Sequence, residues 1–77
     1  STIIRYDLPN NSFVSLTVYD MMGRVVKNLI KRTQVAGFQS VQWDATNNKN
    51  QPVSAGIYIY SIYSDSFIDT KKMILVK

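Results

Sequence analysis

The stretch GFQSVQWDATNNKNQPVSAGIYIYSIY, residues 37 to 63, decides the fold of this chain. Val41 and Trp43 alternate with polar residues, as is typical of a strand that is buried on one face. Residues 44–52 are rich in side chains that favour turns, so they predict a surface loop. From Gly56 onward Ile and Tyr alternate, and both resulting faces are largely apolar. We therefore expect a strand in the middle of a sheet, covered on each side.

Two further strands are predicted before this stretch. Apolar and polar residues alternate in residues 2–8, which end at Pro9, and again in residues 13–19. Such an alternation marks a sheet face that packs on a core. Residues 20–24 then predict a hairpin turn in which Gly23 supplies the positive φ.

The remaining segments complete an all-β pattern. A third strand is predicted over residues 25–30, where the irregular spacing of Val26 and Leu29 allows a bulge. Residues 31–37 are a basic connection, and residues 67–77 form the last strand. About seven short strands separated by turns predict a small antiparallel β-sandwich, in one domain spanning residues 1–77. The inward positions assign the core to Val14, Leu16, Val18, Val41, Trp43 and Tyr60.

The composition limits what can hold this fold together. The chain has 77 residues, no Cys, no His and no Glu, and a net charge of +4. Disulfides and the commonest structural metal ligands are therefore absent, and we expect packing alone to stabilise the domain without any cofactor. No signal peptide and no apolar run of the roughly 20 residues that a bilayer requires is visible. We expect a soluble chain.

The acidic residues do not predict catalysis. General acid–base chemistry needs titratable groups that lie close enough to tune one another. The five carboxylates lie on separate predicted strands and turns, at Asp7, Asp20, Asp44, Asp65 and Asp69. We expect no catalytic residue and no enzyme activity.

The polar loop raises the question of a cation site. Asp44, with the oxygens of Thr46 and of the following Asn residues, offers ligands of the kind that calcium prefers. Only one of these groups is a carboxylate, however. The alternative is a turn in which Asp44 accepts hydrogen bonds from nearby backbone N–H groups, and we favour that interpretation.

The excess of basic over acidic residues and the number of tyrosines raise the question of nucleic-acid binding. Aromatic side chains on a positively charged sheet face suit single strands, and an exposed aromatic platform would also suit carbohydrate. The tyrosines alternate with isoleucines, however, and the basic residues lie in separate places. We expect Trp43, Tyr58 and Tyr60 to be mostly buried, with no nucleic-acid partner.

Several motifs together resemble a known family. They are ST-x-I-x-Y-x-LP at residues 1–9, VYD-x-x-GR-x-V at 18–26, AG at 36–37, V-x-WD at 41–44, G-x-Y at 56–58 and TKKM at 70–73. In order and spacing they resemble the C-terminal sorting domain of the type IX (Por) secretion system. The pattern is also similar to the immunoglobulin-like domain of the flagellar hook-capping protein. One departure is Asn50, where many relatives carry glycine; Asn also tolerates a left-handed backbone.

The resemblance implies an immunoglobulin-like sandwich with a role in export. Such domains direct secreted proteins of the Bacteroidetes across the periplasm and outer membrane to the cell surface or medium. The implied partners are the type IX machinery, a sortase-like peptidase and the N-terminal cargo domains of the parent protein. The family's motif positions fall here on Asp20, Gly23, Arg24, Gly56 and Tyr58. Recognition is expected at the basic end of the last strand, at Lys71, Lys72 and Lys77.

A structural role is the alternative. The chain would then be an immunoglobulin-like scaffold or spacer domain of an extracellular enzyme or of a hook-capping-like protein. Lysines on a last strand can also serve simply to discourage aggregation between sheet edges. A homodimer through an uncapped edge strand is a further possibility for so small a sandwich.

Overall fold

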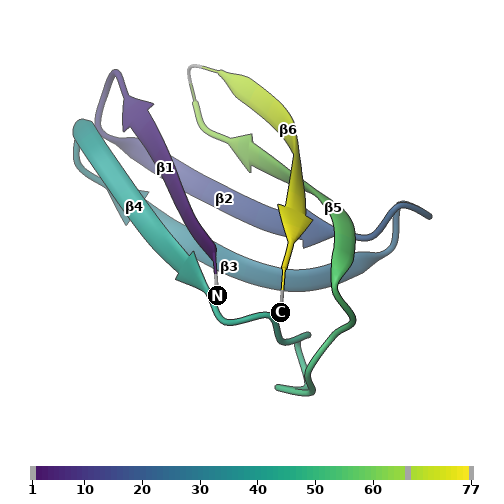
Figure 1. Ribbon diagram of the computed structural model, residues 1–77. Helices are drawn as coiled ribbons and strands as arrows, with labels where there is room; N and C mark the ends of the chain where they lie inside the picture. Colours follow the sequence, from purple (N-terminus) through teal and green to yellow (C-terminus); the bar gives the residue numbers. More distant parts are fainter. Residues whose placement is uncertain (1, 66, 77) are drawn as a thin grey trace.

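The computed structural model describes residues 2–65 and 67–76, and these residues form an antiparallel β-sandwich (Figure 1). The strands in this part of the chain are β1 (Thr2–Leu8), β2 (Ser12–Tyr19), β3 (Val25–Gln34), β4 (Gly37–Trp43), β5 (Gly56–Tyr63) and β6 (Ile68–Leu75). One sheet has the order β1-β4 and the other the order β3-β2-β5-β6. The predicted all-β sandwich is confirmed, with six described strands where about seven were expected.

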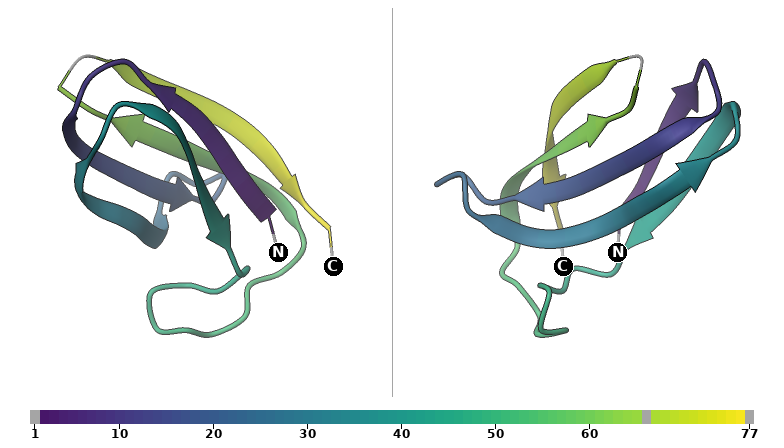
Figure 2. Two further views of the ribbon diagram at one scale, coloured as in Figure 1. Left: turned by 90° about the vertical axis from the view of Figure 1, so that its left-hand side faces the viewer. Right: turned by 180° about the vertical axis from the view of Figure 1, so that it is seen from behind.

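The two sheets pack face to face. In Figure 1, β1 and β4 lie in front of β2 and β3, and the view from behind in Figure 2 reverses that order. Alternate residues of β1, namely Ile4, Tyr6 and Leu8, enter a buried cluster with residues of the larger sheet. The members from that sheet are Val14, Leu16, Ile30 and Ile62. The two-residue alternation seen in the sequence thus becomes one side of the core.

A second buried cluster is built around Trp43 at the end of β4. The indole has no exposed surface, and it meets the Tyr58 ring edge-on at 5.1 Å and 72° between the ring planes. Its Nε1–H donates to the carbonyl oxygen of Thr46 at 2.9 Å, and the Tyr58 hydroxyl donates to that of Ser54 at 2.6 Å. Both rings therefore bury their apolar surface while their polar atoms keep hydrogen-bond partners.

The position of β5 is confirmed, but its predicted cover on both faces is wrong. The strand lies inside the four-stranded sheet, between β2 and β6. Tyr58 and Ile62 are buried and Tyr60 is partly buried on the inner face. On the opposite face Ile57 and Tyr63 are 42% and 45% exposed. The described residues contribute no third layer there, so apolar side chains stay on the surface.

Strand β3 is longer than expected. Residues 31–34, predicted as part of a connection, continue the pairing with β2 as far as Ser12↔Gln34. The pairing survives these polar residues because Gln34 is buried and its Oε1 accepts a hydrogen bond from the Tyr6 hydroxyl. Burial raises the pKa of Tyr6, so this hydroxyl remains a donor.

The predicted bulge is confirmed, and a second one lies close to it. The register between β2 and β3 shifts after Leu16 and again after Val18. Leu29 and Val26 are the residues of β3 that are left without an opposite partner at these two shifts. Val26 is buried in the Trp43 cluster and Leu29 packs against both clusters, so the bulges add apolar side chains to the core.

The last strand, β6, lies at an edge of the four-stranded sheet. Lys77, which belongs to the predicted last strand, lies outside the described residues. Within residues 2–65 and 67–76 there is no helix long and apolar enough to span a membrane.

We expect Tyr58→Phe to lower the free energy of unfolding by about 1 kcal/mol, because it removes the hydrogen bond that the buried Tyr58 side chain donates to the Ser54 carbonyl. Urea denaturation followed by tryptophan fluorescence measures this. Tyr63→Phe is the matched control, since Tyr63 is 45% exposed on the outer face; its effect should stay within about 0.5 kcal/mol. Equal losses in the two variants would contradict a specific role for the Tyr58 hydroxyl.

Candidate recognition surfaces

The hairpin turn between β2 and β3 is organised by one carboxylate. Asp20 Oδ1 accepts hydrogen bonds from the N–H groups of Met22 and Arg24, both at 2.9 Å. Its Oδ2 accepts from Arg24 Nε at 2.9 Å, which makes an ion pair as well. Gly23 has a φ of +83°, as the turn prediction required. The same turn exposes Met22, whose side chain is directed away from the core.

Hydrogen bonds set the charge state of this turn. The backbone N–H of Arg24 is the largest cause that lowers the pKa of Asp20, and the Arg24 side chain and the N–H of Met22 act in the same direction. A carboxyl whose pKa is lower in the folded state stabilises the fold above its unfolded pKa. That contribution is lost as the pH falls through the folded value.

We therefore expect the Asp20 contribution to be acid-sensitive. Thermal unfolding of the wild type and of Asp20→Asn, compared from neutral pH to about pH 2, measures the contribution. The wild type should be more stable at neutral pH, and the difference should shrink as the pH falls below the ordinary aspartate range. Asp65→Asn removes an exposed carboxylate from the β5–β6 turn, and it is the matched control for the loss of one negative charge. A difference that stays constant with pH would argue against the charge of Asp20.

The polar loop between β4 and β5 closes on itself through side-chain caps. Asn47 Oδ1 accepts from the N–H groups of Lys49 and Gln51, at 2.9 and 3.0 Å. Asn50 has a φ of +60°, so it adopts the left-handed backbone that was expected to replace glycine. Ala45 also has a positive φ, of 64°. The sequence did not indicate this, because alanine rarely adopts that conformation.

The loop also binds the edge strand β3. Asn48 N–H donates to the Val26 carbonyl and Asn28 N–H donates to Asn48 Oδ1, each at 2.9 Å. Lys27 extends its ammonium group into the loop. Its Nζ donates to Asn47 O and Asn50 Oδ1 at 3.0 Å and to Thr46 Oγ1 at 3.3 Å. The loop oxygens that suggested a cation site thus surround a cation supplied by the chain itself.

Asp44 takes part in a turn, as we favoured. Its Oδ1 accepts from the Thr46 backbone N–H at 3.2 Å and from the Thr46 hydroxyl. The hydroxyl is the largest cause that lowers the pKa of Asp44, and the charge of Lys27 adds to it. Among the described residues, no three Asp side chains come together as metal ligands would. Sequence reasoning missed Lys27, because nothing in a lysine 20 residues away indicates its contact with Asn47.

We expect Lys27→Met to lower the free energy of unfolding by about 1 kcal/mol, because three loop oxygens lose a charged donor at a partly exposed site. Chemical denaturation measures the loss. Lys49→Met is the control, since it removes the same charge from an exposed position in the loop; it should change stability by less than about 0.5 kcal/mol. Unchanged stability in Lys27→Met would show that the ammonium contacts are not structural.

Some of the motif segments lie at one end of the four-stranded sheet, whereas those at residues 2–9, 36–37 and 41–44 belong to the two-stranded sheet or its connection. The turn of Asp20 to Arg24 follows the end of β2, and Gly56 and Tyr58 begin β5. Tyr19 pairs with Ile59 on β5, and Gly56 pairs with Leu75 at the end of β6. Gly56 has a φ of +148°, at the point where the chain leaves the loop and enters the sheet. These segments are far apart in the sequence but lie at the same end of the sheet.

Two of the predicted recognition lysines, Lys71 and Lys72, lie on opposite faces of β6. Lys71 pairs with Tyr60 in the register and shares the inner face, whereas Lys72 pairs with Ile59 and shares the outer face. Both are exposed because β6 is an edge strand. Lys71 Nζ lies 3.8 Å from Asp69 Oδ2, an exposed pair that contributes little to stability. Lys72 makes no ion pair with any residue that the structure describes, and its charge lies on the outer face of β6.

The remaining predicted residues lie mostly in the core. Val14, Leu16, Val18 and Trp43 are fully buried. Val41 and Tyr60 are partly buried and pack against the clusters. The expectation that the large aromatics avoid the surface therefore describes Trp43 and Tyr58 well, and Tyr60 in part.

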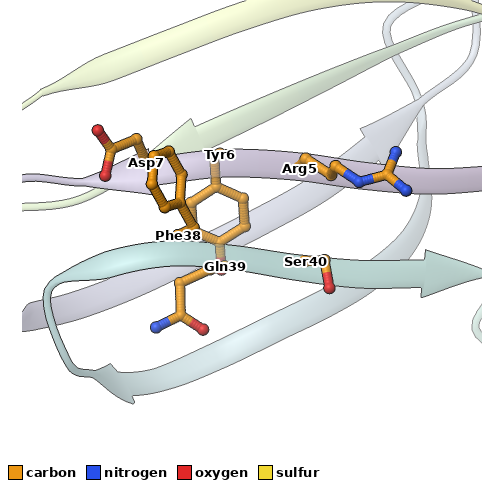
Figure 3. A pocket seen from close by; sticks show the side chains of 6 residues that line it. All are labelled: Arg5, Tyr6, Asp7, Phe38, Gln39 and Ser40. Atoms are coloured by element: carbon orange, nitrogen blue, oxygen red, sulfur yellow. The ribbon is translucent and has the colours of Figure 1, made fainter.

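An exposed aromatic does occur on the outer face of the two-stranded sheet. Phe38 is 91% exposed, and it borders a shallow hollow of about 540 Å³ (Figure 3). The other residues that line the hollow are Arg5, Tyr6, Asp7, Gln39 and Ser40. Sequence reasoning missed Phe38, because a phenylalanine next to Gly37 in a predicted strand gives no sign that its face is open.

The comparison with protein families gives a match over most of the chain. Residues 2–66 match the family described as the FlgD Ig-like domain. Among solved structures, that of FlgD from P. aeruginosa is similar, with a TM-score of 0.75 and 26% sequence identity. The match covers 95% of this chain and 58% of the FlgD chain.

A second similar structure comes from a larger protein. It is PorZ of Porphyromonas gingivalis, described as an essential bacterial surface component of the type-IX secretion system. The TM-score is 0.60 and the identity 14%, over 97% of this chain and 11% of the PorZ chain. At that identity the similarity shows the fold alone. No curated protein sequence matches the chain.

Proposed function

Because this chain belongs to the family of FlgD Ig-like domains, we propose that it is a recognition module of a larger exported protein, without catalytic activity of its own. In this role it directs its parent protein through the type IX secretion system to the cell surface or the medium. The parent's N-terminal domains are the cargo. The translocation machinery and a sortase-like peptidase are the partners.

The observation that carries this proposal is that three segments of the resemblance lie at the same end of the four-stranded sheet. The Asp20–Arg24 turn, the Gly56–Tyr58 start of β5 and the end of β6 lie at one end of the sheet. These segments carry the resemblance to type IX sorting domains, and a partner that docks at this end can contact all of them. The similarity to PorZ is compatible with this proposal, although it concerns the fold alone.

The absence of catalysis is proposed from the residue types. His and Cys do not occur in the sequence, and Asp20 and Asp44 are committed to turns. A nucleophile activated by a neighbouring base has no candidate among such groups.

A structural scaffold is the second candidate, favoured by the 26% identity to FlgD over 95% of the chain. In this role the sandwich would space or dock neighbouring domains of an extracellular enzyme or of a hook-capping-like protein. Recognition by an export system would not be required.

Export of a reporter separates the two candidates. A periplasm-directed fluorescent protein fused to the N-terminal side of this chain is expressed in a Bacteroidetes strain with a working type IX system, and in a strain without its translocon. We expect reporter on the surface or in the medium of the competent strain only. Periplasmic retention of a folded fusion in both strains would favour the scaffold.

Point variants of the fusion then test the basic end of the last strand. Lys71→Ala, Lys72→Ala and Lys77→Ala should each reduce export if the partner binds these charges, while Lys49→Ala removes a charge from the polar loop and should not. Since Lys71 and Lys72 lie on opposite faces, a loss confined to one of them identifies the face that the partner contacts. Export unchanged in all variants would exclude the lysines as the recognised groups.

A further inference from the structure

The outer face of the two-stranded sheet combines a protruding ring with a hollow. Three registered pairs form this face: Ile3 with Gln42, Arg5 with Ser40, and Asp7 with Phe38. Phe38 is 91% exposed and Ile3 is 52% exposed. Apolar side chains that protrude so far from a sheet lose their contact with water only when something covers them.

Arg5 and Asp7, the two charged residues on this face, have no ion-pair partner among the described residues. Arg5 and Asp7 are both exposed and lie two residues apart, so they share a face of β1. Among the described residues, neither side chain makes a hydrogen bond or an ion pair, whereas Asp20 and Asp69 pair with Arg24 and Lys71. Figure 3 shows Arg5 and Asp7 directed toward opposite ends of the hollow. One end of the face is therefore positive and the other negative.

We propose that this face binds the same face of a second copy of the chain. Consider a two-fold axis that lies between the β1–β4 sheets of the two copies, passes over β1 at Tyr6 and runs perpendicular to that strand. It places Arg5 opposite the partner's Asp7, and Asp7 opposite the partner's Arg5. On β4 it places Phe38 opposite the partner's Ser40, within the hollow beside the partner's Arg5. Each charge gains an opposite partner and each exposed ring gains a cavity and a guanidinium to contact.

The other exposed apolar face does not fit a second copy in this way. The outer face of the four-stranded sheet carries Ile57, Tyr63 and Ile74 among its exposed residues. Its charged residues are Lys31 and Lys72, which the register places there, and its four described strands contribute no carboxylate to it. Two such faces would bring like charges together, which opposes self-association. The proposal is independent of the export role.

Charge exchange tests the contact. Sedimentation velocity of the 77-residue chain over a range of concentrations gives the dimer dissociation constant at low and at high salt. Arg5→Asp and Asp7→Arg each create two like-charge contacts per dimer, so each should raise the dissociation constant at least about tenfold. An equimolar mixture of the two variants should associate again as a heterodimer, and the double variant R5D/D7R should associate as a homodimer.

Substitution of Phe38 distinguishes a dimer through the proposed face from a dimer through the edge of β1. Antiparallel pairing of two β1 edges would also align Arg5 with the partner's Asp7, but it would leave Phe38 of β4 outside the contact. Phe38→Ser should therefore raise the dissociation constant by about tenfold or more for the proposed face. Ile74→Ser, on the other sheet, should leave it unchanged.

Four outcomes would overturn the proposal. The first is a wild type that stays monomeric at millimolar concentration, and the second is single charge variants that associate like the wild type. The third is a mixture that fails to associate although both variants show the wild-type circular dichroism and melting behaviour. The fourth is association that is insensitive to Phe38→Ser. The last outcome would assign the contact to the β1 edge.

Discussion

The burial of Trp43 is the constraint on which the rest of this small fold depends. A chain with neither cysteine nor histidine lacks disulfides and the commonest structural metal ligands, so packed apolar area is its main source of stability. Trp43 ends β4, contacts Tyr58 at the start of β5 and donates to Thr46 in the loop between them. One side chain thereby connects the two sheets and sets the path of the longest connection.

The polar loop makes a second connection, because it forms hydrogen bonds with strand β3 of the larger sheet. Lys27 from the bulged part of β3 inserts its ammonium among the loop oxygens. Asn48 closes part of the β3 edge, because its N–H donates to the Val26 carbonyl and its Oδ1 accepts from the Asn28 N–H. An edge strand that is covered in this way offers fewer free backbone groups to another chain. The loop therefore acts both as a connection between sheets and as a partial cover of one edge.

Much of the fold could be predicted, because alternation along a strand is a local property. The burial of Trp43, the interior position of β5 and the bulge near Leu29 follow from residue spacing alone. The rest depends on contacts between distant segments. The polar residues 31–34 predict a connection, and only their pairing with β2 keeps them in a strand. Likewise, no local pattern reveals whether a second layer covers Ile57 or Phe38, or that Lys27 lies inside the loop.

The two bulges of β3 have a consequence for how the sequence can change during evolution. One extra residue reverses the inward and outward alternation of everything that follows it, and a second extra residue restores it. With both Leu29 and Val26 inserted, Val25 returns to the outer face opposite Tyr19, and the hairpin turn keeps its orientation. Loss of only one of these two residues would exchange the inward-facing and outward-facing positions at the start of β3. Homologous sequences are therefore expected to gain or lose residues here in pairs, so that the two bulges are inherited together.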